Sequence, residues 1–188
     1  MTVDDLRFTE IEHKFIVLHH GQYSSKPGRS GNLGVNVFWM DKFLDAGVDM
    51  VLSGHDHYYE RTWPVLNSTV QDRGVNGNGI DFSEPGAPIH IIAGTAGRGS
   101  YDYDNDQPEW VYYREKSYGM MVIVADADIM HVEYQRHDGE VGDAFTLYQV
   151  EPPVKEEESG ILPSPSLLLS LCAFAIAAAR GREKPSRT

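Results

Sequence analysis

Cysteine and basic residues are both scarce in this sequence of 188 residues. The one cysteine, Cys172, excludes an intrachain disulfide and a zinc site built from thiolates. Lysine and arginine total 16 against 28 aspartate and glutamate residues, so the formal net charge is -12. Because such a chain repels a polyanion, we expect no nucleic-acid partner. The length suffices for one domain with a hydrophobic core.

The pattern of a secretory leader is not found in TVDDLRFTEIEHKF, which has no basic segment followed by an apolar one. The other end has the pattern of an anchor. The apolar stretch Leu167–Ala179 follows a proline- and charge-rich segment and precedes several basic residues. Counted from Ile161 it has 19 residues, close to the roughly 20 that span a bilayer. The basic residues beyond it predict a cytoplasmic C-terminus and a folded domain outside the cell.

The expected organisation is therefore a folded domain at 1–150, an acidic linker at 151–160, and a transmembrane or sorting tail at 161–188. The tail predicts contact with a membrane and a cell-surface or extracellular location. A core helix docked on the domain is the alternative for this tail.

A strand, a helix and a second strand are predicted in the first third of the chain. The apolar run Lys14–His20 and the run Val48–His55 are typical of buried strands. Between them, 36–46 has helical spacing of apolar residues, with Asn36 as N-cap and Gly47 as stop. Such a unit makes a parallel sheet, so the fold class is α/β.

Histidines follow both predicted strands. His19 and His20 end the first, while His55 and His57 end the second, with Asp56 between them. Because ligands of parallel α/β sheets gather beyond the carboxyl ends of the strands, the two groups are expected on one rim. Neutral imidazole is a common ligand of zinc and iron. The pattern therefore predicts a metal site, with Gly54 allowing a sharp turn and Asp56 facing away or supporting a ligand.

The remaining chain is expected to be richer in loops and strands. We expect a loop at 67–86, a strand entering a glycine loop at 87–97, and an ordered aromatic loop at 99–119. The glycine loop at 94–99 and the aromatic residues at 101–113 either line the site or are structural. Three alternating segments close the domain as a meander, with HDGE at 137–140 as a hairpin turn.

The segment GHDHYYER, residues 54–61, resembles the GHxHxYER signature of the purple acid phosphatases, which belong to the calcineurin-like metallophosphoesterases. IVLHHGQYSS, residues 16–25, is similar to that family's VxxH motif, and DGEVGDAF, residues 138–145, to its closing strands. The resemblance covers residues 11–148. It implies the C-terminal half of an αββα sandwich, followed here by the apolar anchor helix.

The resemblance also implies a dinuclear metal centre, with iron paired with zinc, manganese or a second iron. Carried over by motif, His19 and His55 bind one metal and His57 the other, with His20 the choice if the register slips. His20, Tyr23, Arg29 and Asp56 are then candidates for contact with substrate or for support of the ligands. Glu60 and Arg61 fit a structural pair, and no catalytic residue is assigned. The implied activity is hydrolysis of a small phosphomonoester.

The family's GDxG, GDxxY and GNH motifs, which supply the other ligands, do not occur in this sequence. We therefore expect the chain to be the C-terminal part of a surface phosphatase and a poor enzyme by itself. Two other functions stay open. One is a nucleotidase or phosphodiesterase of the wider superfamily, and the other is a surface metal-binding or adhesion module that lost catalysis.

Overall fold

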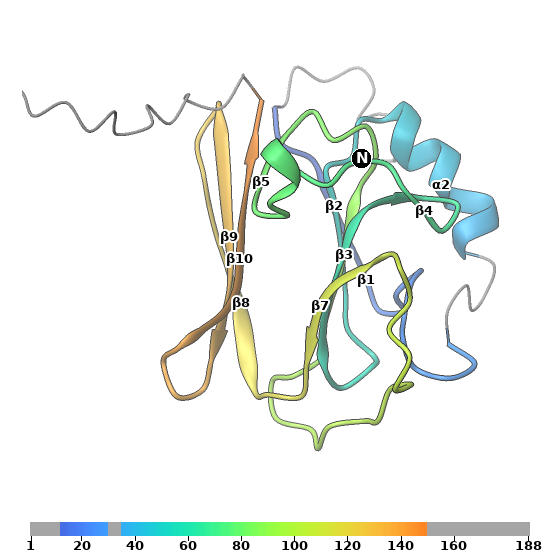
Figure 1. The fold of residues 1–188 in the computed structure, drawn as a ribbon, viewed down its shortest axis with the longest axis vertical. Coiled ribbons are helices and arrows are strands. Elements are labelled where there is room, and N and C mark those ends of the chain that lie inside the picture. Colours follow the sequence, from blue (N-terminus) through green and yellow to red (C-terminus); the bar gives the residue numbers. More distant parts are fainter. Residues whose placement is uncertain (1–11, 30–34, 150–188) are drawn as a thin grey trace, which may run out of the picture. The chain divides into compact units, whose positions relative to one another are not determined.

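The computed structural model describes residues 12–29 and 35–149, which contain two β-sheets that face each other (Figure 1). The first sheet has the order β1-β2-β6-β3-β4, and β7 also pairs with β3. Its strands are β1 (Phe15–Leu18), β2 (Met50–Ser53), β3 (Tyr59–Leu66), β4 (Thr69–Val70), β6 (Ile89–Ala93) and β7 (Val111–Glu115). The second has the order β5-β10-β9-β8, with β5 (Asp81–Ser83), β8 (Gly119–Ala125), β9 (Ile129–Arg136) and β10 (Val141–Tyr148).

The predicted strand-helix-strand unit is present. Strand β1 pairs in parallel with β2, and β2 pairs in parallel with β6. The crossover contains helix α2 (Val35–Asp45), which ends before Gly47 at a φ of 63°. Phe43 and Ala46 lie at the end of this helix and pack with Val51 of β2. The parallel arrangement brings the carboxyl ends of β1 and β2 to the same edge of the sheet.

The main hydrophobic core lies between the two sheets. Alternate residues of β6, β9 and β10 point inward because successive side chains of a strand face opposite sides. Ile89 and Ile91, Met130, Val132 and Tyr134, and Phe145 and Leu147 are all buried there. The predicted meander is confirmed, since β8, β9 and β10 pair antiparallel and residues 137–140 connect the last two.

A buried ion pair connects the two sheets through this core. Arg61 of β3 is fully buried and binds Asp143 of β10 through Nε–Oδ2 at 2.6 Å and Nη2–Oδ1 at 2.9 Å. The Tyr59 hydroxyl donates to Asp143 Oδ2 at 2.8 Å, and Arg61 also donates to the Gly79 carbonyl at 3.1 Å. We call Tyr59, Arg61 and Asp143 the inter-sheet polar cluster.

The expectation that Glu60 pairs with Arg61 is wrong. Adjacent residues of a strand face opposite sides, so Glu60 points away from Arg61. It accepts hydrogen bonds from the backbone N–H of Ser25 at 3.0 Å and from the Ser25 hydroxyl. Glu60 and Arg61 each bind a different part of the fold, and they do not bind each other.

The first sheet is mixed, because its parallel strand-helix-strand unit is joined by antiparallel strands. Strand β3 runs antiparallel to β6 and β7, and Pro64 lies where its pairing with β6 shifts register. The region 67–86 contains β4, the 3₁₀ helix η2 (Val75–Gly77) and β5, which pairs in parallel with β10. The expected loop at 99–119 likewise contains β7. These short strands gain their stability from distant partners that local periodicity does not reveal.

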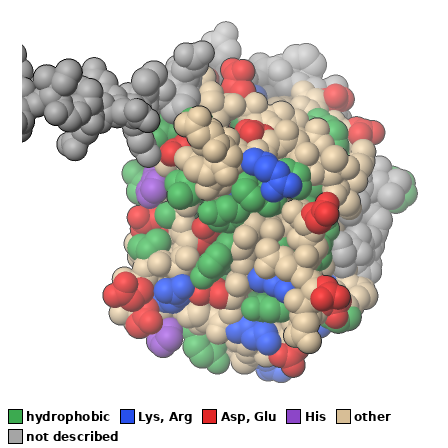
Figure 2. All heavy atoms as spheres, viewed as in Figure 1, with side chains coloured by type: hydrophobic (Ala, Val, Ile, Leu, Met, Phe, Trp, Pro, Cys, Tyr) green, Lys and Arg blue, Asp and Glu red, His purple; other side chains and the backbone are tan. Residues whose placement is uncertain are grey.

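Helix α2 covers the first sheet, and within 12–29 and 35–149 no helix covers the second (Figure 1). The observed fold is thus a sheet-rich α/β arrangement of helix, sheet and sheet. The predicted linker and anchor helix at 151–188 lie outside the described residues. The helical segments that the structure does describe are too short to cross a bilayer, α2 having 11 residues. On the face drawn in Figure 2, lysine and arginine are interspersed with aspartate and glutamate.

Candidate metal centre

The carboxyl ends of β1 and β2 bring three histidines into contact. His55 Nδ1 lies 3.2 Å from His19 Nε2, and the His20 and His55 ring centroids are 3.9 Å apart. One ring nitrogen from each of the three lies within 4.8 Å of the others. The backbone N–H of Gly54 donates to the His19 carbonyl at 3.2 Å, which fastens the two loops together. We call His19, His20 and His55 the histidine rim.

The sharp turn after β2 occurs at His55, one residue later than expected. His55 has a φ of 63°, whereas Gly54 is not among the residues with positive φ. A residue with a Cβ in this left-handed region costs about 1 kcal/mol or more. Surrounding contacts hold the conformation, and it turns the His55 ring toward His19. Residues kept in such conformations cluster at functional sites.

His57 lies apart from the rim but shares a pocket with it. The pocket has a volume of about 350 Å³ and is lined by His19, His55 and His57 together with part of the glycine loop. The His57 ring stacks on Tyr101 at a centroid distance of 3.9 Å. His57 Nδ1 lies 3.2 Å from the Gly99 carbonyl, to which only a protonated nitrogen can donate. This bond leaves the Nε2 lone pair of neutral His57 for a ligand.

The two loops whose role was left open therefore line the site. Gly97 and Arg98 of the glycine loop and Tyr101 of the aromatic loop contribute to the pocket wall. Tyr101 also donates its backbone N–H to the His57 carbonyl at 3.1 Å. Tyr101 was not singled out from the sequence, where only its position in an aromatic segment marked it.

Arg29 lies against the rim. Its Nη1 contacts His55 Nε2, and its Nε lies 3.9 Å from Asp56 Oδ1. The guanidinium is always protonated, so His55 Nε2 accepts this contact as the neutral imidazole. Partial removal from water, followed by the positive fields of His20 and Arg29, lowers the pKa of His55. Both effects favour the neutral form that binds metals.

Asp56 faces away from the rim. Its side chain is 3% exposed, and its Oδ2 accepts a hydrogen bond from the Ser24 hydroxyl at 2.7 Å. The Ser24 hydroxyl also contacts Tyr58 Oη at 2.7 Å. Asp56 thus ties the loop between His55 and His57 to the loop that follows β1.

The structure places Tyr23 outside this group. It is 1% exposed, and its hydroxyl accepts the backbone N–H of Ser68 at 3.2 Å. Its ring packs 5.2 Å from Trp110 and 4.8 Å from His90. Of the seven residues proposed from the sequence, six therefore lie in or beside the pocket, and Tyr23 belongs to the packing behind it.

The arrangement of the ring nitrogens can be compared with what a metal ion requires of its ligands. Three imidazole nitrogens within 4.8 Å of one another suit the neutral ligands of one divalent ion. An ion at His55 would compete with Arg29 or with His19 for a ring nitrogen. Within the described residues the rim has no carboxylate beside its rings, because Asp56 is turned to Ser24. The residues fit the imidazole share of a metal centre.

Comparisons with known proteins show which proteins this chain is similar to. Residues 87–144 match a family model described as iron/zinc purple acid phosphatase-like protein C. The chain is 35% identical over 103 residues to probable inactive purple acid phosphatase 1 of Arabidopsis thaliana, covering 53% of this chain and 16% of that protein. It is 40% identical over 80 residues to acid phosphatase type 7 of Danio rerio, covering 41% and 17%.

A third relative is a nucleotide pyrophosphatase/phosphodiesterase of Hordeum vulgare, 31% identical over 105 residues, with 54% of this chain and 27% of that protein covered. Among solved structures, a purple acid phosphatase from yellow lupin seeds has a similar fold. Its TM-score is 0.68 at 20% identity, with 78% of this chain and 27% of that chain covered. The chain thus spans between 16% and 27% of the length of these four relatives.

Proposed function

This chain is a purple acid phosphatase-like member of the calcineurin-like metallophosphoesterases. We propose that it supplies the histidine ligands of a metal-dependent phosphoester hydrolase. The observation that carries the proposal is the histidine rim, whose three ligand atoms lie within 4.8 Å of one another. The rim lies at the edge of the sheet where ligands of such folds bind.

Each residue has a role in this proposal. His19 and His55 hold one metal ion, with His20 as the neighbouring donor, and His57 offers Nε2 to a second ion. When bound there, two ions, iron with zinc, manganese or a second iron, would supply polarisation of the phosphoryl oxygens and a lowered pKa of bound water. Arg29 lies beside the rim and can bind a phosphoryl oxygen, since guanidinium groups bind phosphate through charge-assisted hydrogen bonds. Asp56 and Ser24 hold the loops that carry the ligands.

A second candidate is a surface module that binds metal without hydrolysing phosphoesters. Two observations favour it. One relative is named a probable inactive purple acid phosphatase, and the described part of the rim has no carboxylate beside its imidazoles. A small phosphomonoester stays the proposed substrate, and the barley relative's name keeps a phosphodiester as the alternative.

We place the protein at the cell surface or outside the cell, anchored by 161–188. The support is the apolar stretch followed by basic residues in the sequence. The net charge of -12 supports the absence of a nucleic-acid partner.

The proposal is tested with the purified full chain, stripped of metal with a chelator and titrated with Zn²⁺, Mn²⁺ or Fe²⁺ by calorimetry. Hydrolysis of an aryl phosphate is then measured on the loaded protein. His55→Ala should weaken metal binding at least tenfold and abolish the low rate of hydrolysis expected of this chain. The matched control is His131→Ala, a partly exposed histidine of β9 that contacts Thr146 and Glu133.

The outcomes separate the two candidates. Metal binding that depends on His55, with hydrolysis, supports the hydrolase. The same binding without hydrolysis supports the metal-binding module instead. Absence of binding, or equal loss in both variants, overturns both.

A further inference from the structure

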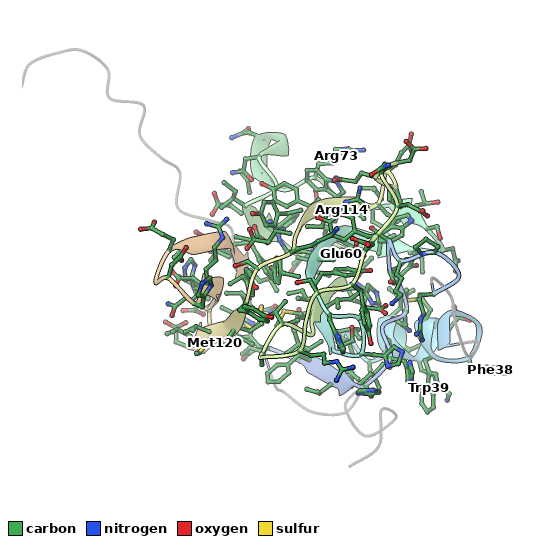
Figure 3. All side chains as sticks on the ribbon, turned by 90° about the horizontal axis from the view of Figure 1, so that it is seen from below. Phe38, Trp39, Glu60, Arg73, Arg114 and Met120 are labelled. Carbon is green, nitrogen blue, oxygen red and sulfur yellow. The ribbon has the colours of Figure 1, made fainter. Side chains whose placement is uncertain are left out.

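A second pocket lies beside the candidate metal centre. It has a volume of about 300 Å³ and is formed by the loop 95–97, the start of β8 and the end of β9. We call it the Met120 pocket after a side chain that is 64% exposed. Figure 3 labels Met120 on the side of the domain away from Phe38 and Trp39 of helix α2. None of the candidate metal ligands, His19, His20, His55 and His57, lines this pocket.

The two pockets adjoin through the glycine loop. Ala96 and Gly97 line both of them. Both residues are exposed, and a Cβ built at Gly97 would meet no atom within 4 Å. The Thr95 hydroxyl donates to the Gly119 carbonyl at 3.1 Å, which fastens this loop to β8. The wall that the two pockets share therefore consists of small, exposed residues.

The walls of the Met120 pocket suit a flat, uncharged group. Tyr118 is 44% exposed, and its ring lies 6.1 Å from that of His137, at right angles to it. Aromatic edges and faces and the thioether of a methionine all contact rings favourably. Tyr118 and Met120 flank Gly119, where a Cβ would meet the Tyr134 ring, so both side chains lie on the opposite face from that contact.

The charged group in the pocket wall is already neutralised. Arg136 donates from Nε to Glu115 Oε1 at 3.0 Å and from Nη2 to Glu115 Oε2 at 2.8 Å. Its Nη2 also donates to the Tyr113 hydroxyl at 3.1 Å. Because the Glu115 carboxylate neutralises the guanidinium, an anion should gain little free energy by moving from water into the pocket.

We propose that the Met120 pocket holds the neutral aromatic group of a phosphoester whose phosphate lies at the histidine rim. The inference rests on the proposed function, because the rim must bind the phosphate. Ala96 and Gly97 provide the passage between the two groups, and Tyr118 and Met120 contact the ring. The site therefore prefers aryl phosphoesters to those of small alkyl alcohols.

The test uses two phosphonates that cannot be hydrolysed, phenylphosphonate and methylphosphonate, with inorganic phosphate as the reference anion. Their affinities for the Zn²⁺-loaded full chain are measured by calorimetry. Phenylphosphonate should bind about tenfold more tightly than methylphosphonate. Tyr118→Ala and Met120→Ala should each reduce this ratio to about two, with the methylphosphonate affinity unchanged. Val124→Ala is the matched control, because Val124 is 65% exposed on the same strand and does not line the pocket.

Each result decides the matter. Equal affinities in the wild type, or a ratio that survives both substitutions, overturn the aromatic pocket while phosphate binding leaves the proposed function standing. If phosphate and both phosphonates fail to bind the loaded protein, the proposed function and this inference fall together. Circular dichroism confirms that the two surface variants fold.

Discussion

The inter-sheet polar cluster and the histidine rim are both groups of polar side chains, but they differ in how their charges are matched. In the cluster, Arg61 is fully buried and both oxygens of Asp143 accept hydrogen bonds from it. In the rim, His19 is exposed, and the neighbours that contact the imidazoles are other imidazoles and the cationic Arg29. The charge of Arg61 in the inter-sheet polar cluster is balanced by that of Asp143. The histidine rim and Arg29 instead bring together groups of the kind that bind metals and anions.

The difference indicates that the inter-sheet polar cluster stabilises the fold, and it agrees with the proposal that the histidine rim binds a ligand. A buried charge is tolerated only when it is paired and hydrogen-bonded, and the inter-sheet polar cluster meets that condition. A group of three neighbouring imidazoles beside an arginine, in which the pKa of His55 is lowered by burial and by nearby positive charge, gains little stability from its own contacts. Such an arrangement is typical of a binding site, as the proposed function requires.

The largest effect should come from a substitution in the inter-sheet polar cluster. Asp143→Ala leaves Arg61 buried without its carboxylate, so we expect the free energy of unfolding to fall by about 3–5 kcal/mol. Urea denaturation measures this loss. His19→Ala, in the exposed rim, is the comparison and should change stability by less than about 0.5 kcal/mol. Similar losses in the two variants would show that the contrast drawn here is wrong.

A second prediction concerns Glu60, a buried carboxyl that accepts hydrogen bonds from Ser25 and lies opposite Arg114 of β7. Burial raises its pKa to about 7, against hydrogen bonds from Ser25 that lower it. The folded state thus keeps a proton that the unfolded state releases near pH 4.5, so this contribution to stability is present below pH 4.5 and lost as pH rises through 7. Relative to Glu60→Gln, the wild type should lose up to about 3 kcal/mol over that interval.

The comparison between variant and wild type is needed because His90 acts in the opposite direction. Burial lowers the pKa of His90 to about 3, so the unfolded state takes up a proton below pH 6.5 that the folded state refuses. Acid therefore weakens the fold through His90 in both proteins. Denaturation curves between pH 4.5 and 7.5 that stay parallel for the two proteins would rule out a raised pKa at Glu60.

The smallest effect concerns the candidate metal centre. Tyr101→Leu removes the ring that stacks on His57 at 3.9 Å, so His57 loses orientation and Zn²⁺ affinity should fall about tenfold. Tyr103→Leu is the matched control, since Tyr103 packs against Tyr58 and not against His57. Calorimetry on the full chain measures both. Equal affinities in the two variants would mean that His57 is positioned without the stack.

Local pattern was enough to predict the unit that carries the histidine rim. The runs at 14–20 and 48–55 are apolar and end in polar residues, and helix α2 has a helical period that Gly47 ends. Parallel pairing then follows from the crossover, so the meeting of His19 with His55 could be predicted without a structure. The left-handed backbone at His55 could not, because a glycine precedes it and is the residue that usually takes such a turn.

Distant partners account for most of what the sequence did not reveal. Tyr23 follows the VxxH-like motif, but its direction depends on Ser68 and Trp110, which lie far along the chain. Strand β5 has three residues, too few for a periodic pattern, and exists through pairing with β10. Arg61 appeared to belong with its neighbour Glu60, whereas its partner Asp143 is 82 residues away.

That separation has a consequence for synthesis on the ribosome. Strand β5 and Arg61 both wait for β10, the last strand of the described domain, so the two sheets cannot close until residue 148 has left the exit tunnel. Until then the nascent chain exposes the apolar faces of β2 and β6 together with an unpaired arginine. Long-range pairing of this kind folds slowly and leaves sticky surfaces open. Chaperones are therefore expected to hold this chain through most of its translation.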